Sequence, residues 1–536
     1  MNKEFDIIIV GAGSAGCVLA NRLSARPDLN VLLLEAGDKD NWVWFKVPVG
    51  YLFAIGNPRA DWMFNTTPQD SLGGRSLAYP RGKTLGGSSA INAMISMRGQ
   101  KADYEGWKAS GLTDWGWDDV LPAFKRIEDH FLGDTDHHGS GGEWRVEYPR
   151  VQWDILDALR DAGEEMGIPK TEDFNTGDNE GSGYFHVNQK NGVRWSSARG
   201  FLKPIMKRPN LHVETGVTVE SLIIENGRLT GVAALKGKQT CTYQAKAGVV
   251  LSSGSIGSVQ ILQRSGIGPA ESLKAAGIWP LQDKPRIGGN LQDHLQQRAI
   301  YKVSNTNTLN QAYHSVFGKA RMGLDYALFR KGPLTMAPSQ VGIFTRSDDN
   351  QPRPNIQFHL QPLSLDRFGE PLHKFPAITV AACNLRPTSR GTVRITGPTA
   401  SDGVDISPNY LSTDEDRKIA ADAIRVTRRL MSQPTLFPYA PEEFLPGPTV
   451  SDDQHDLERA AGQIGTTIFH PVGTIAMGGD NDPTSPLDQR FRFRSLEKLW
   501  VVDASAMPFI SSGNTNTPTI MMAERGAEMI LEDLKA

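Results

Sequence analysis

Two polar side chains near the carboxyl end of the sequence could act together on a proton. His470 stands in the stretch TTIFHPVGT, and Asn514 stands in SSGNTNTPT. An imidazole takes up or releases a proton near neutral pH, and an amide beside it can hold the same oxygen atom. Because Pro471 favours an extended backbone at His470, we expect the imidazole to project from a strand end or a loop. A histidine before a proline is also common as a structural residue, so the catalytic interpretation requires a converging ligand site.

A glycine-rich stretch at the start of the chain predicts such a ligand site. Gly11, Gly13 and Gly16 follow the apolar run IIIV in G-x-G-x-x-G spacing, and a second apolar run ends at Glu35. The first glycine permits a tight turn, the second lets the backbone approach a pyrophosphate, and the third lets a helix pack closely. A carboxylate at this distance can bind a ribose diol. The pattern predicts a dinucleotide site; a glycine turn that only packs is the alternative.

Alternating strands and helices would place these residues at one edge of a parallel sheet. Residues 7–10 and 31–34 are apolar runs typical of buried parallel strands, and residues 17–23 have one apolar helical face. The glycine turn therefore precedes a helix N-terminus, whose free N–H groups attract phosphate. We assign Ser14, within the turn, and Ala36, after the second strand, to the same site.

Two later segments extend this architecture. Residues 246–268 have the pattern of a strand, a Gly/Ser turn and a helix without a second G-x-G-x-x-G, which assigns them to the same dinucleotide domain. Residues 499–502 form a predicted strand that ends at Asp503, and Thr517-Pro518 predicts a helix start. The two candidate catalytic residues thus flank one helix N-terminus, whose dipole favours negative charge in front of it.

A further small-residue turn lies in the stretch RGKTLGGSSAINAMISMR, residues 81–98. Gly86, Gly87 and the two serines after them can bring the backbone against a flat or phosphorylated ligand, and they can also cap a helix. Asn92 would lie one turn into that helix and reach a polar edge of the ligand. The preceding residues, 41–80, are rich in Trp, Pro, Gly and Asn. They predict an irregular segment that either covers the ligand or packs as a surface loop.

Composition and charge limit the class of protein. The chain has 536 residues, 39% of them hydrophobic and 22% charged, which is ordinary for a globular protein with room for two domains. A net charge of −3 gives no reason to expect nucleic acid as a partner. Three scattered cysteines, and the adjacent His137 and His138 without partners at metal spacing, predict neither a disulfide scaffold nor a metal site. Without a signal-peptide pattern or a membrane-length apolar run, we expect a soluble cytoplasmic protein, with peripheral attachment to the inner membrane left open.

The pattern changes between residues 299 and 459. Alternating stretches such as PNIQFHLQPL and AITVAACNLRP appear together with the amphipathic DEDRKIAADAIRVTRRLM. This combination predicts a mixed sheet covered by helices. The predicted fold is therefore α/β, with a Rossmann-like dinucleotide-binding domain and a second, α+β, substrate-binding domain. We assign to the first domain residues 1–150, 195–298 and 460–536, and to the second residues 151–194 and 299–459.

Along essentially its whole length the chain resembles the glucose–methanol–choline (GMC) oxidoreductases, a family of flavoproteins. VGAGSAGCVLANRLS and LLLEAG are similar to the family's FAD fingerprint, and RGKTLGGSSAINAM and SGSIGSVQILQRSGIG to its two signatures. GNLQDH, FHPVGT, VVDASAMP and GNTNTPTIMMAE follow in family order and spacing. Within the family the bacterial alcohol and choline dehydrogenases are most similar. The resemblance implies that the first domain binds FAD.

The resemblance also implies roles for individual residues. His470 matches the family's active-site histidine, the base or hydrogen-bond partner of the substrate alcohol, and Asn514 matches a position held by Asn or a second His. Asn92 matches a residue beside the flavin ring, and Val217 a backbone contact to the adenine. Further cofactor contacts are implied at Arg81, Gly86, Gly87, Asp503, Ala504, Asn516 and Thr517.

Four positions differ from the family pattern. Ile91 stands where choline oxidases carry the histidine that binds FAD covalently, so we expect non-covalent FAD. Gln340 stands where choline- and alkanol-type members carry Glu, and Phe469 where some choline enzymes carry Tyr. Loss of the carboxylate argues against a quaternary ammonium substrate. Val259 replaces the usual Pro of the second signature, which we interpret as a tolerated change at a helix start.

The implied reaction is oxidation of a small-molecule alcohol to an aldehyde or ketone, with hydride transfer to flavin N5. His470 would take or orient the hydroxyl proton, Asn514 would hold the same oxygen, and the helix at Pro518 would stabilise the reduced flavin. The electron acceptor is a quinone, another carrier or O₂, so an oxidase of the same fold is the first alternative.

Three other functions are less favoured, and the oligomeric state is open. Retention of His470 in an intact HPVGT argues against a fatty-acid photodecarboxylase, and retention of His470 and Asn514 argues against a non-catalytic flavin-binding protein. A two-nucleotide disulfide reductase would need a second glycine fingerprint and a cysteine pair, which the sequence lacks.

Overall fold

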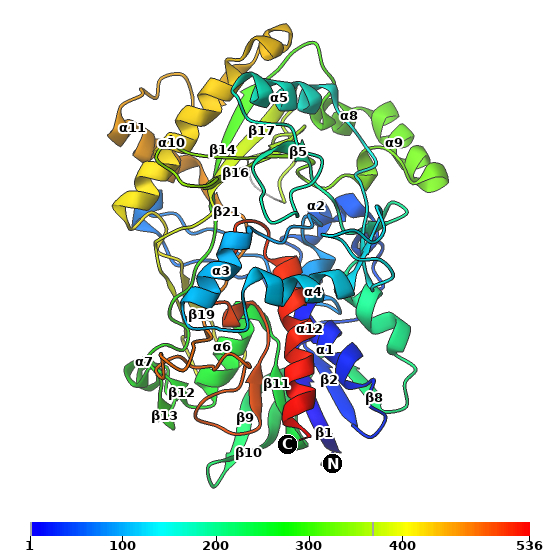
Figure 1. Cartoon of the computed structure of the whole chain (residues 1–536), viewed down its shortest axis with the longest axis vertical. Helices are drawn as coiled ribbons and strands as arrows, with labels where there is room; N and C mark the ends of the chain where they lie inside the picture. Colours follow the sequence, from blue (N-terminus) through cyan, green and yellow to red (C-terminus); the bar gives the residue numbers. More distant parts are fainter. Residues whose placement is uncertain (1–2, 367–368, 536) are drawn as a thin grey trace.

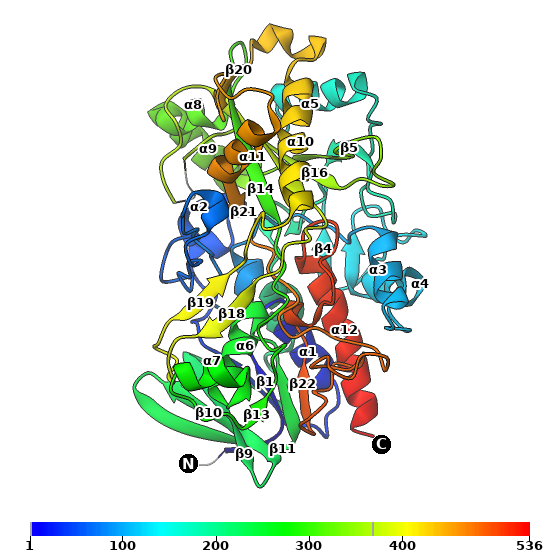
Figure 2. The same cartoon turned by 90° about the vertical axis from the view of Figure 1, so that its left-hand side faces the viewer.

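The computed structural model describes residues 3–366 and 369–535, and it has two halves, each built around one β-sheet (Figure 1). The first and last described elements both lie in the half drawn at the bottom of Figure 1. The view turned by 90° shows the same division into a lower and an upper half (Figure 2). The chain passes between the halves several times, so each half contains segments that are far apart in the sequence.

The lower sheet combines parallel strands with an antiparallel pair. Its order is β8 (Leu211–Thr215), β2 (Val31–Glu35), β1 (Lys3–Val10), β11 (Gln239–Leu251), β10 (Arg228–Lys236) and β9 (Val217–Glu225), with β22 (Leu499–Val501) also paired to β11. The pairings from β8 through β11 and on to β22 are parallel, whereas β11–β10 and β10–β9 are antiparallel. The three strands expected at residues 7–10, 31–34 and 499–502 are thus confirmed within one sheet.

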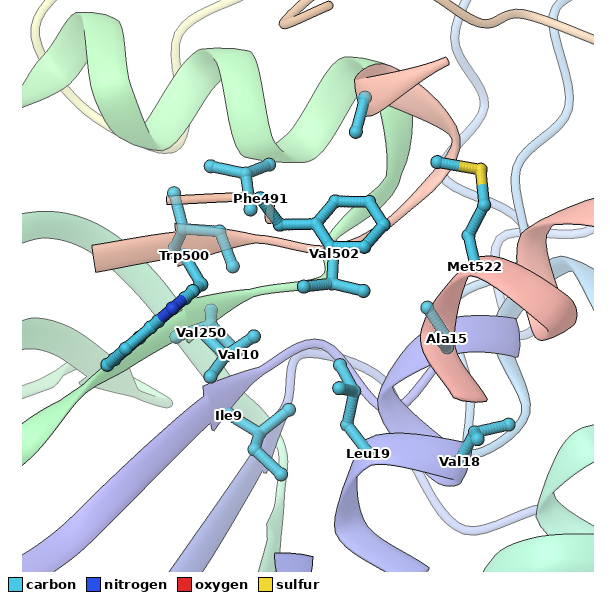
Figure 3. Close-up of a cluster of buried hydrophobic side chains, with 14 of the residues drawn as sticks. Ile9, Val10, Ala15, Val18, Leu19, Val250, Phe491, Trp500, Val502 and Met522 are labelled. Carbon is cyan, nitrogen blue, oxygen red and sulfur yellow. The ribbon is translucent and has the colours of Figure 1, made fainter. Parts of the chain in front are cut away.

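Three helices pack against this sheet: α1 (Ser14–Leu23), α6 (Gly254–Arg264) and α12 (Asn516–Asp533). Figure 3 shows Leu19 of α1 and Met522 of α12 in one buried cluster with Val250 and Trp500 of the sheet. The turn into α1 depends on Gly16, because a Cβ there would come within 1.8 Å of the carbonyl oxygen of Gly11. The third glycine of the fingerprint therefore serves packing, as expected.

The upper sheet is antiparallel in all its assigned pairings. Its order is β20 (Glu442–Leu445), β14 (Leu295–Lys302), β17 (Ala377–Asn384), β16 (Ile356–Gln361), β15 (Val341–Thr345) and β5 (Gly181–Tyr184), with β21 (Gly465–Thr467) also paired to β14. One face is covered by α5 (Asp154–Glu165) and α10 (Asp414–Met431), which share its apolar core. The α/β class with a second α+β unit is confirmed, but strand direction corrects the mixed sheet that we expected. Parallel neighbours would each need a long crossover, which β15 and β16 lack.

The limits of the two domains remain a prediction. The hairpin of β18 (Thr392–Ile395) and β19 (Val404–Ser407) falls in the range assigned to the second domain. Its Val393 and Ile406 are nevertheless buried in the apolar core of the lower half.

The remaining elements flank or connect the sheets. They are α2 (Tyr51–Ala54), α3 (Lys101–Ala109), α4 (Trp117–Ile127), α7 (Ala270–Ala275), α8 (Leu309–His314), α9 (Val316–Phe329), α11 (Gln454–Ile464), β3 (Glu128–His130), β4 (Trp144–Val146), β6 (Gln189–Lys190), β7 (Val193–Arg194), β12 (Ile267–Gly268) and β13 (Gln282–Asp283). None of the helices within residues 3–366 and 369–535 is long and apolar enough to cross a membrane.

The turn after Gly86 does not start the helix that we expected to contain Asn92. It forms only a 3₁₀ turn, η4 (Gly87–Ala90), because Gly86 (φ 93°) and Met94 (φ 61°) are left-handed and interrupt a helix on both sides. The Asn92 side chain accepts a hydrogen bond from the Met94 backbone N–H at 3.0 Å and so stabilises the bend. The irregular character expected for residues 41–80 is confirmed, since only short turns and α2 interrupt that segment.

Candidate active site

A cavity between the two sheets brings most of the predicted site residues together. Its walls come from β1, β2 and β9 of the lower sheet and from β14 and β16 of the upper sheet. The predicted residues that line it are Gly11, Gly13, Ser14, Glu35, Ala36, Arg81, Gly87, Asn92, Val217, His470, Asp503, Ala504, Asn514 and Asn516. Gly16, Gly86 and Thr517 are not among the lining residues.

The lower end of the cavity is built largely from backbone. Gly11 has a φ of 98°, and its N–H donates to the carbonyl of Leu34 at 2.8 Å, which holds the tight turn between β1 and α1. At Gly13 an added Cβ would find no protein atom closer than the Ser252 carbonyl oxygen at 4.0 Å. Gly13 therefore leaves space that the protein itself does not need, as a backbone that approaches a pyrophosphate must.

Glu35 closes this end of the cavity. One of its carboxylate oxygens accepts from the Ala12 N–H at 2.9 Å and the other from the Gly37 N–H at 2.8 Å. Burial raises the pKa of the Glu35 carboxyl to about 7, although these two N–H groups act in the opposite direction. The carboxylate is thus held rigidly at the cavity wall, where its remaining lone pairs can accept from a ribose diol.

The N-terminus of α12 faces the cavity beside the glycine turn. The helix begins at Asn516, two residues before Pro518, rather than at the Thr517-Pro518 step that we predicted. Proline is tolerated there because the first helical turn has no intrahelical partner for its N–H groups. Ser14 donates to the Asn516 side-chain oxygen at 2.6 Å, and within the described chain the buried Asn516 Nδ2 has no partner. That amide is a donor available to a ligand.

Asp503 contributes to the site through the backbone that it holds. The carboxylate accepts from the Gly254 N–H at 2.8 Å and from the Ser258 hydroxyl at 2.6 Å, at the start of α6. Burial raises its pKa above the usual value. A second strand–turn–helix unit is therefore fixed against the cavity, as residues 246–268 suggested.

The upper end of the cavity contains a chain of hydrogen bonds through His470. His294 Nε2 lies 3.0 Å from the carbonyl oxygen of Leu385, and His294 Nδ1 lies 3.0 Å from His470 Nδ1. Because a carbonyl only accepts, a neutral His294 carries its proton on Nε2 and presents a lone pair at Nδ1. His470 then donates from Nδ1, and its Nε2 keeps a lone pair, to which Asn514 Nδ2 donates at 3.1 Å.

This arrangement leaves His470 with an unprotonated ring nitrogen, Nε2. The pKa of His470 lies well below its usual value, first because burial disfavours the imidazolium and also because of the nearby His294 and His359. The imidazole is therefore neutral at pH 7, with its lone pair at Nε2. The Asn514 side-chain oxygen is buried beside His470, so it can accept a hydrogen bond from a substrate hydroxyl.

The loop that presents His470 is clamped from several sides. The His470 N–H donates to one carboxylate oxygen of Asp293 at 2.7 Å, and the other oxygen accepts from Tyr79, Tyr410 and Thr467. Arg81 donates to the Phe469 carbonyl at 2.7 Å, and Phe469 itself has a left-handed φ of 71°. The imidazole thus projects from a loop after β21, as Pro471 suggested, but side chains far away in sequence hold that loop.

Sequence reasoning missed several residues at this end. His359 and Gln361 of β16 and Gln296 of β14 line the cavity, and His294 stands behind His470. One signal was present: in IQFHLQ every second residue is polar, so one face of a buried strand had to meet something polar. Burial lowers the pKa of His359 to about 3. His294 ends the stretch GNLQDH, which was matched to the family without a role being assigned to the histidine.

The structure also changes the interpretation of Gln340. Its amide nitrogen donates to the Val151 carbonyl at 2.9 Å, and Ser339 rather than Gln340 lines the cavity. Ile91 and Phe469 both line the cavity, so those two departures from the family pattern do concern the site. No cluster of His, Cys, Asp or Glu in the described chain could hold a metal ion.

The residues at the lower end fit FAD. Gly13 leaves room for a pyrophosphate, Glu35 can accept from a ribose, and Asn516 has an unused donor. The helix N-terminus at Asn516, which lines the cavity, adds positive partial charge there.

Comparisons with known proteins agree with this geometry. A family model described as GMC oxidoreductase matches residues 5–296, and a second one matches residues 387–523. An alcohol dehydrogenase (acceptor) from Pseudomonas putida is 39% identical over 98% of this chain and 96% of its own length. An oxygen-dependent choline dehydrogenase from Vibrio vulnificus is 38% identical over 99% of this chain and 95% of its own.

A solved structure supports the same assignment. Pyridoxine 4-oxidase from Mesorbium loti superposes with a TM-score of 0.88 at 32% identity, covering 98% of both chains. The motifs, the cavity that they line and these full-length matches together show that the chain belongs to the GMC oxidoreductase family.

Proposed function

We propose that this FAD-dependent oxidoreductase oxidises a neutral alcohol to the corresponding carbonyl compound, with His470 as the base and Asn514 as its partner. The observation that carries the proposal is the ordered chain Leu385–His294–His470–Asn514, which leaves one lone pair of a neutral imidazole at the cavity wall. FAD, when bound, supplies the acceptor for the carbon-bound hydrogen.

The protein side of the reaction follows from these contacts. The substrate hydroxyl donates to His470 Nε2, and Asn514 Nδ2 moves from the imidazole to the substrate oxygen as it gains charge. His470 then takes the hydroxyl proton on Nε2 and keeps its Nδ1 proton on the bond to His294. The imidazolium is thereby fixed in orientation while the carbonyl forms.

The lining residues favour a neutral substrate over a cation. The carboxylates among the lining residues of the described chain, Glu35 and Asp503, belong to the lower half. The upper end is lined by amides, hydroxyls and neutral imidazoles, including Gln296, Gln361 and Ser339. A quaternary ammonium group would lose its hydration there without a counter-ion.

The test is an anaerobic screen in which loss of the oxidised-flavin absorbance is followed for primary, aryl, sugar and polyol alcohols and for choline. We expect the highest kcat/KM for an uncharged alcohol. A choline kcat/KM well above that of every uncharged alcohol of similar size would overturn the substrate assignment. If the FAD-loaded protein oxidises none of the alcohols, the proposed reaction is wrong.

We further propose that FAD is held non-covalently, because Ile91 lines the cavity where a histidyl bond would otherwise form. Acid or denaturant should then release the flavin into the supernatant. Flavin that stays with the precipitated protein would contradict this.

A second candidate function is an oxidase that passes electrons to O₂. It is supported by the 32% identity to a pyridoxine 4-oxidase. Reduced enzyme mixed with air distinguishes the two: reoxidation within the turnover time indicates an oxidase, and slow reoxidation that a quinone or dye accelerates indicates a dehydrogenase.

A further inference from the structure

Helix α9 has its apolar face directed away from the protein. At the helical period, Val316, Phe317, Leu324 and Leu328 fall on one face, and their exposed fractions are 81%, 89%, 58% and 63%. The opposite face buries Met322 and Tyr326. A surface helix of a globular protein normally directs its apolar stripe to the core, so this stripe lacks a partner within the described chain. Exposed apolar patches of this kind mark interaction sites.

Basic residues surround the exposed stripe. Residues 315–331 contain Lys319, Arg321, Arg330 and Lys331 but a single acid, Asp325, in a chain whose net charge is −3. Around the helix, Lys319 and Arg321 fall on the two sides of the stripe. An apolar face with basic flanks is typical of a helix that lies in the interface of an anionic membrane.

The helix is fixed to the protein near the cavity. Tyr326 packs with Val47, Val49 and Tyr51, and Tyr51 also lines the cavity. Figure 1 and Figure 2 both show α9 at the edge of the upper half, close to α2. The segment that α9 covers is therefore part of the cavity wall, and the exposed stripe lies on the outer side of that wall.

We propose that α9 is an interfacial helix that docks this enzyme on the surface of an anionic lipid bilayer. Its 14 residues span about 21 Å, too short for the roughly 30 Å of a hydrocarbon core, so α9 would lie in the plane of the interface. A second copy of the chain is the less favourable occupant, because a two-fold contact through α9 would bring the two basic rims together. Anionic headgroups instead neutralise the rim while acyl chains cover the stripe.

The test is flotation of the full-length, FAD-loaded protein with vesicles of phosphatidylcholine alone or mixed equally with phosphatidylglycerol. We expect the wild type to float with the anionic vesicles and to dissociate as salt is raised. Phe317→Glu combined with Leu324→Glu should lower binding by about a hundredfold, because two apolar side chains no longer enter the interface. Lys319→Glu combined with Arg321→Glu should remove the preference for anionic lipid.

Trp279→Glu is the matched control. Trp279 is 86% exposed and follows α7 in the sequence, and α7 lies in the lower half, far from α9 in both views, so this variant should bind vesicles like the wild type. Every variant should keep its flavin and its alcohol oxidation with a soluble dye acceptor, since none of these residues lines the cavity. Three results would overturn the proposal: a wild type that binds neither vesicle, equal loss in the Trp279→Glu control, or a dimer in light scattering that Phe317→Glu with Leu324→Glu converts to a monomer. Vesicle flotation does not depend on which alcohol is oxidised, so a failure of the docking proposal can be distinguished from a failure of the proposed function.

Discussion

The two ends of the cavity are built in different ways. The lower end is built from backbone: Gly11, Gly13 and a helix N-terminus shape it, and the Glu35 side chain is itself held by backbone N–H groups. The upper end is built from side chains, and its hydrogen-bond chain joins residues 294, 385, 470 and 514. A binding surface made of backbone is determined by a short stretch of sequence. A network of side chains forms only when the folded chain brings distant residues together. Substitutions at the two ends should therefore fail in different ways.

The largest effects on flavin content and folding are expected from substitutions in the glycine fingerprint. Gly13→Val should fold but contain almost no FAD, because its side chain would enter space that the pyrophosphate needs and the protein does not. Gly16→Val should give no folded protein, because its Cβ would collide with the Gly11 backbone. Circular dichroism and the ratio of flavin to protein absorbance measure both. Normal flavin content in folded Gly13→Val would show that this turn is not the phosphate site.

At the upper end, His470→Ala should keep the fold and the flavin but slow flavin reduction by substrate about 10²–10⁴-fold, the usual contribution of a positioned base. Asn514→Ala should cost less, because it removes a hydrogen bond and no proton acceptor. Anaerobic stopped-flow measures both, with the exposed His455→Ala as the control. If His470→Ala reduces its flavin within roughly threefold of the wild type, His470 is a structural histidine.

A smaller effect should identify His294 as a positioning residue. His294→Leu removes the acceptor for the His470 Nδ1–H, and we expect flavin reduction to slow about 10–100-fold as the imidazole loses its fixed tautomer. His294→Gln can still accept from His470, so it should recover much of the rate. Equal rates in the two variants would show that His294 acts only through packing.

The smallest expected effect is on the pH dependence of kcat/KM. Because burial lowers the pKa of His470, the neutral, basic form persists at lower pH than for a free histidine. The acid limb of kcat/KM should therefore lie below pH ~6.5, the ordinary histidine value, and the rate should be flat through neutrality. In Asn514→Ala the limb should move upward, because the Asn514 N–H no longer stabilises the neutral imidazole at Nε2. An acid limb centred above the ordinary value would contradict the buried, neutral imidazole.

The difference between the two ends also explains what could be predicted from the sequence. The strand, turn, helix, strand and carboxylate from Ile7 to Glu35 are contiguous, and the structure confirms these elements because local spacing determines them. His294 and His359 escaped notice because each acquires its neighbours only in the folded sheet, where β14 pairs with β17 and β21 and β16 pairs with β17. The helix expected around Asn92 was wrong because left-handed residues on both sides interrupt it.

The position of Gln340 could not be predicted from the sequence either. Gln340 was compared with a family carboxylate by its place in the sequence, but in the extended segment just before β15 neighbouring side chains point in different directions. The structure turns Ser339 to the cavity instead. The expectation of a neutral substrate now depends on the lining residues of the upper end rather than on that position.

The positions of the first strand and the last helix have a practical consequence. β1 begins and α12 ends at the bottom of the molecule in both views, whereas α9 lies in the upper half (Figure 1). A linker attached at either end would project from the side opposite α9. The enzyme could therefore be immobilised on an electrode or a bead through a linker at β1 or α12, with a uniform orientation and with the docking face proposed for α9 free in solution.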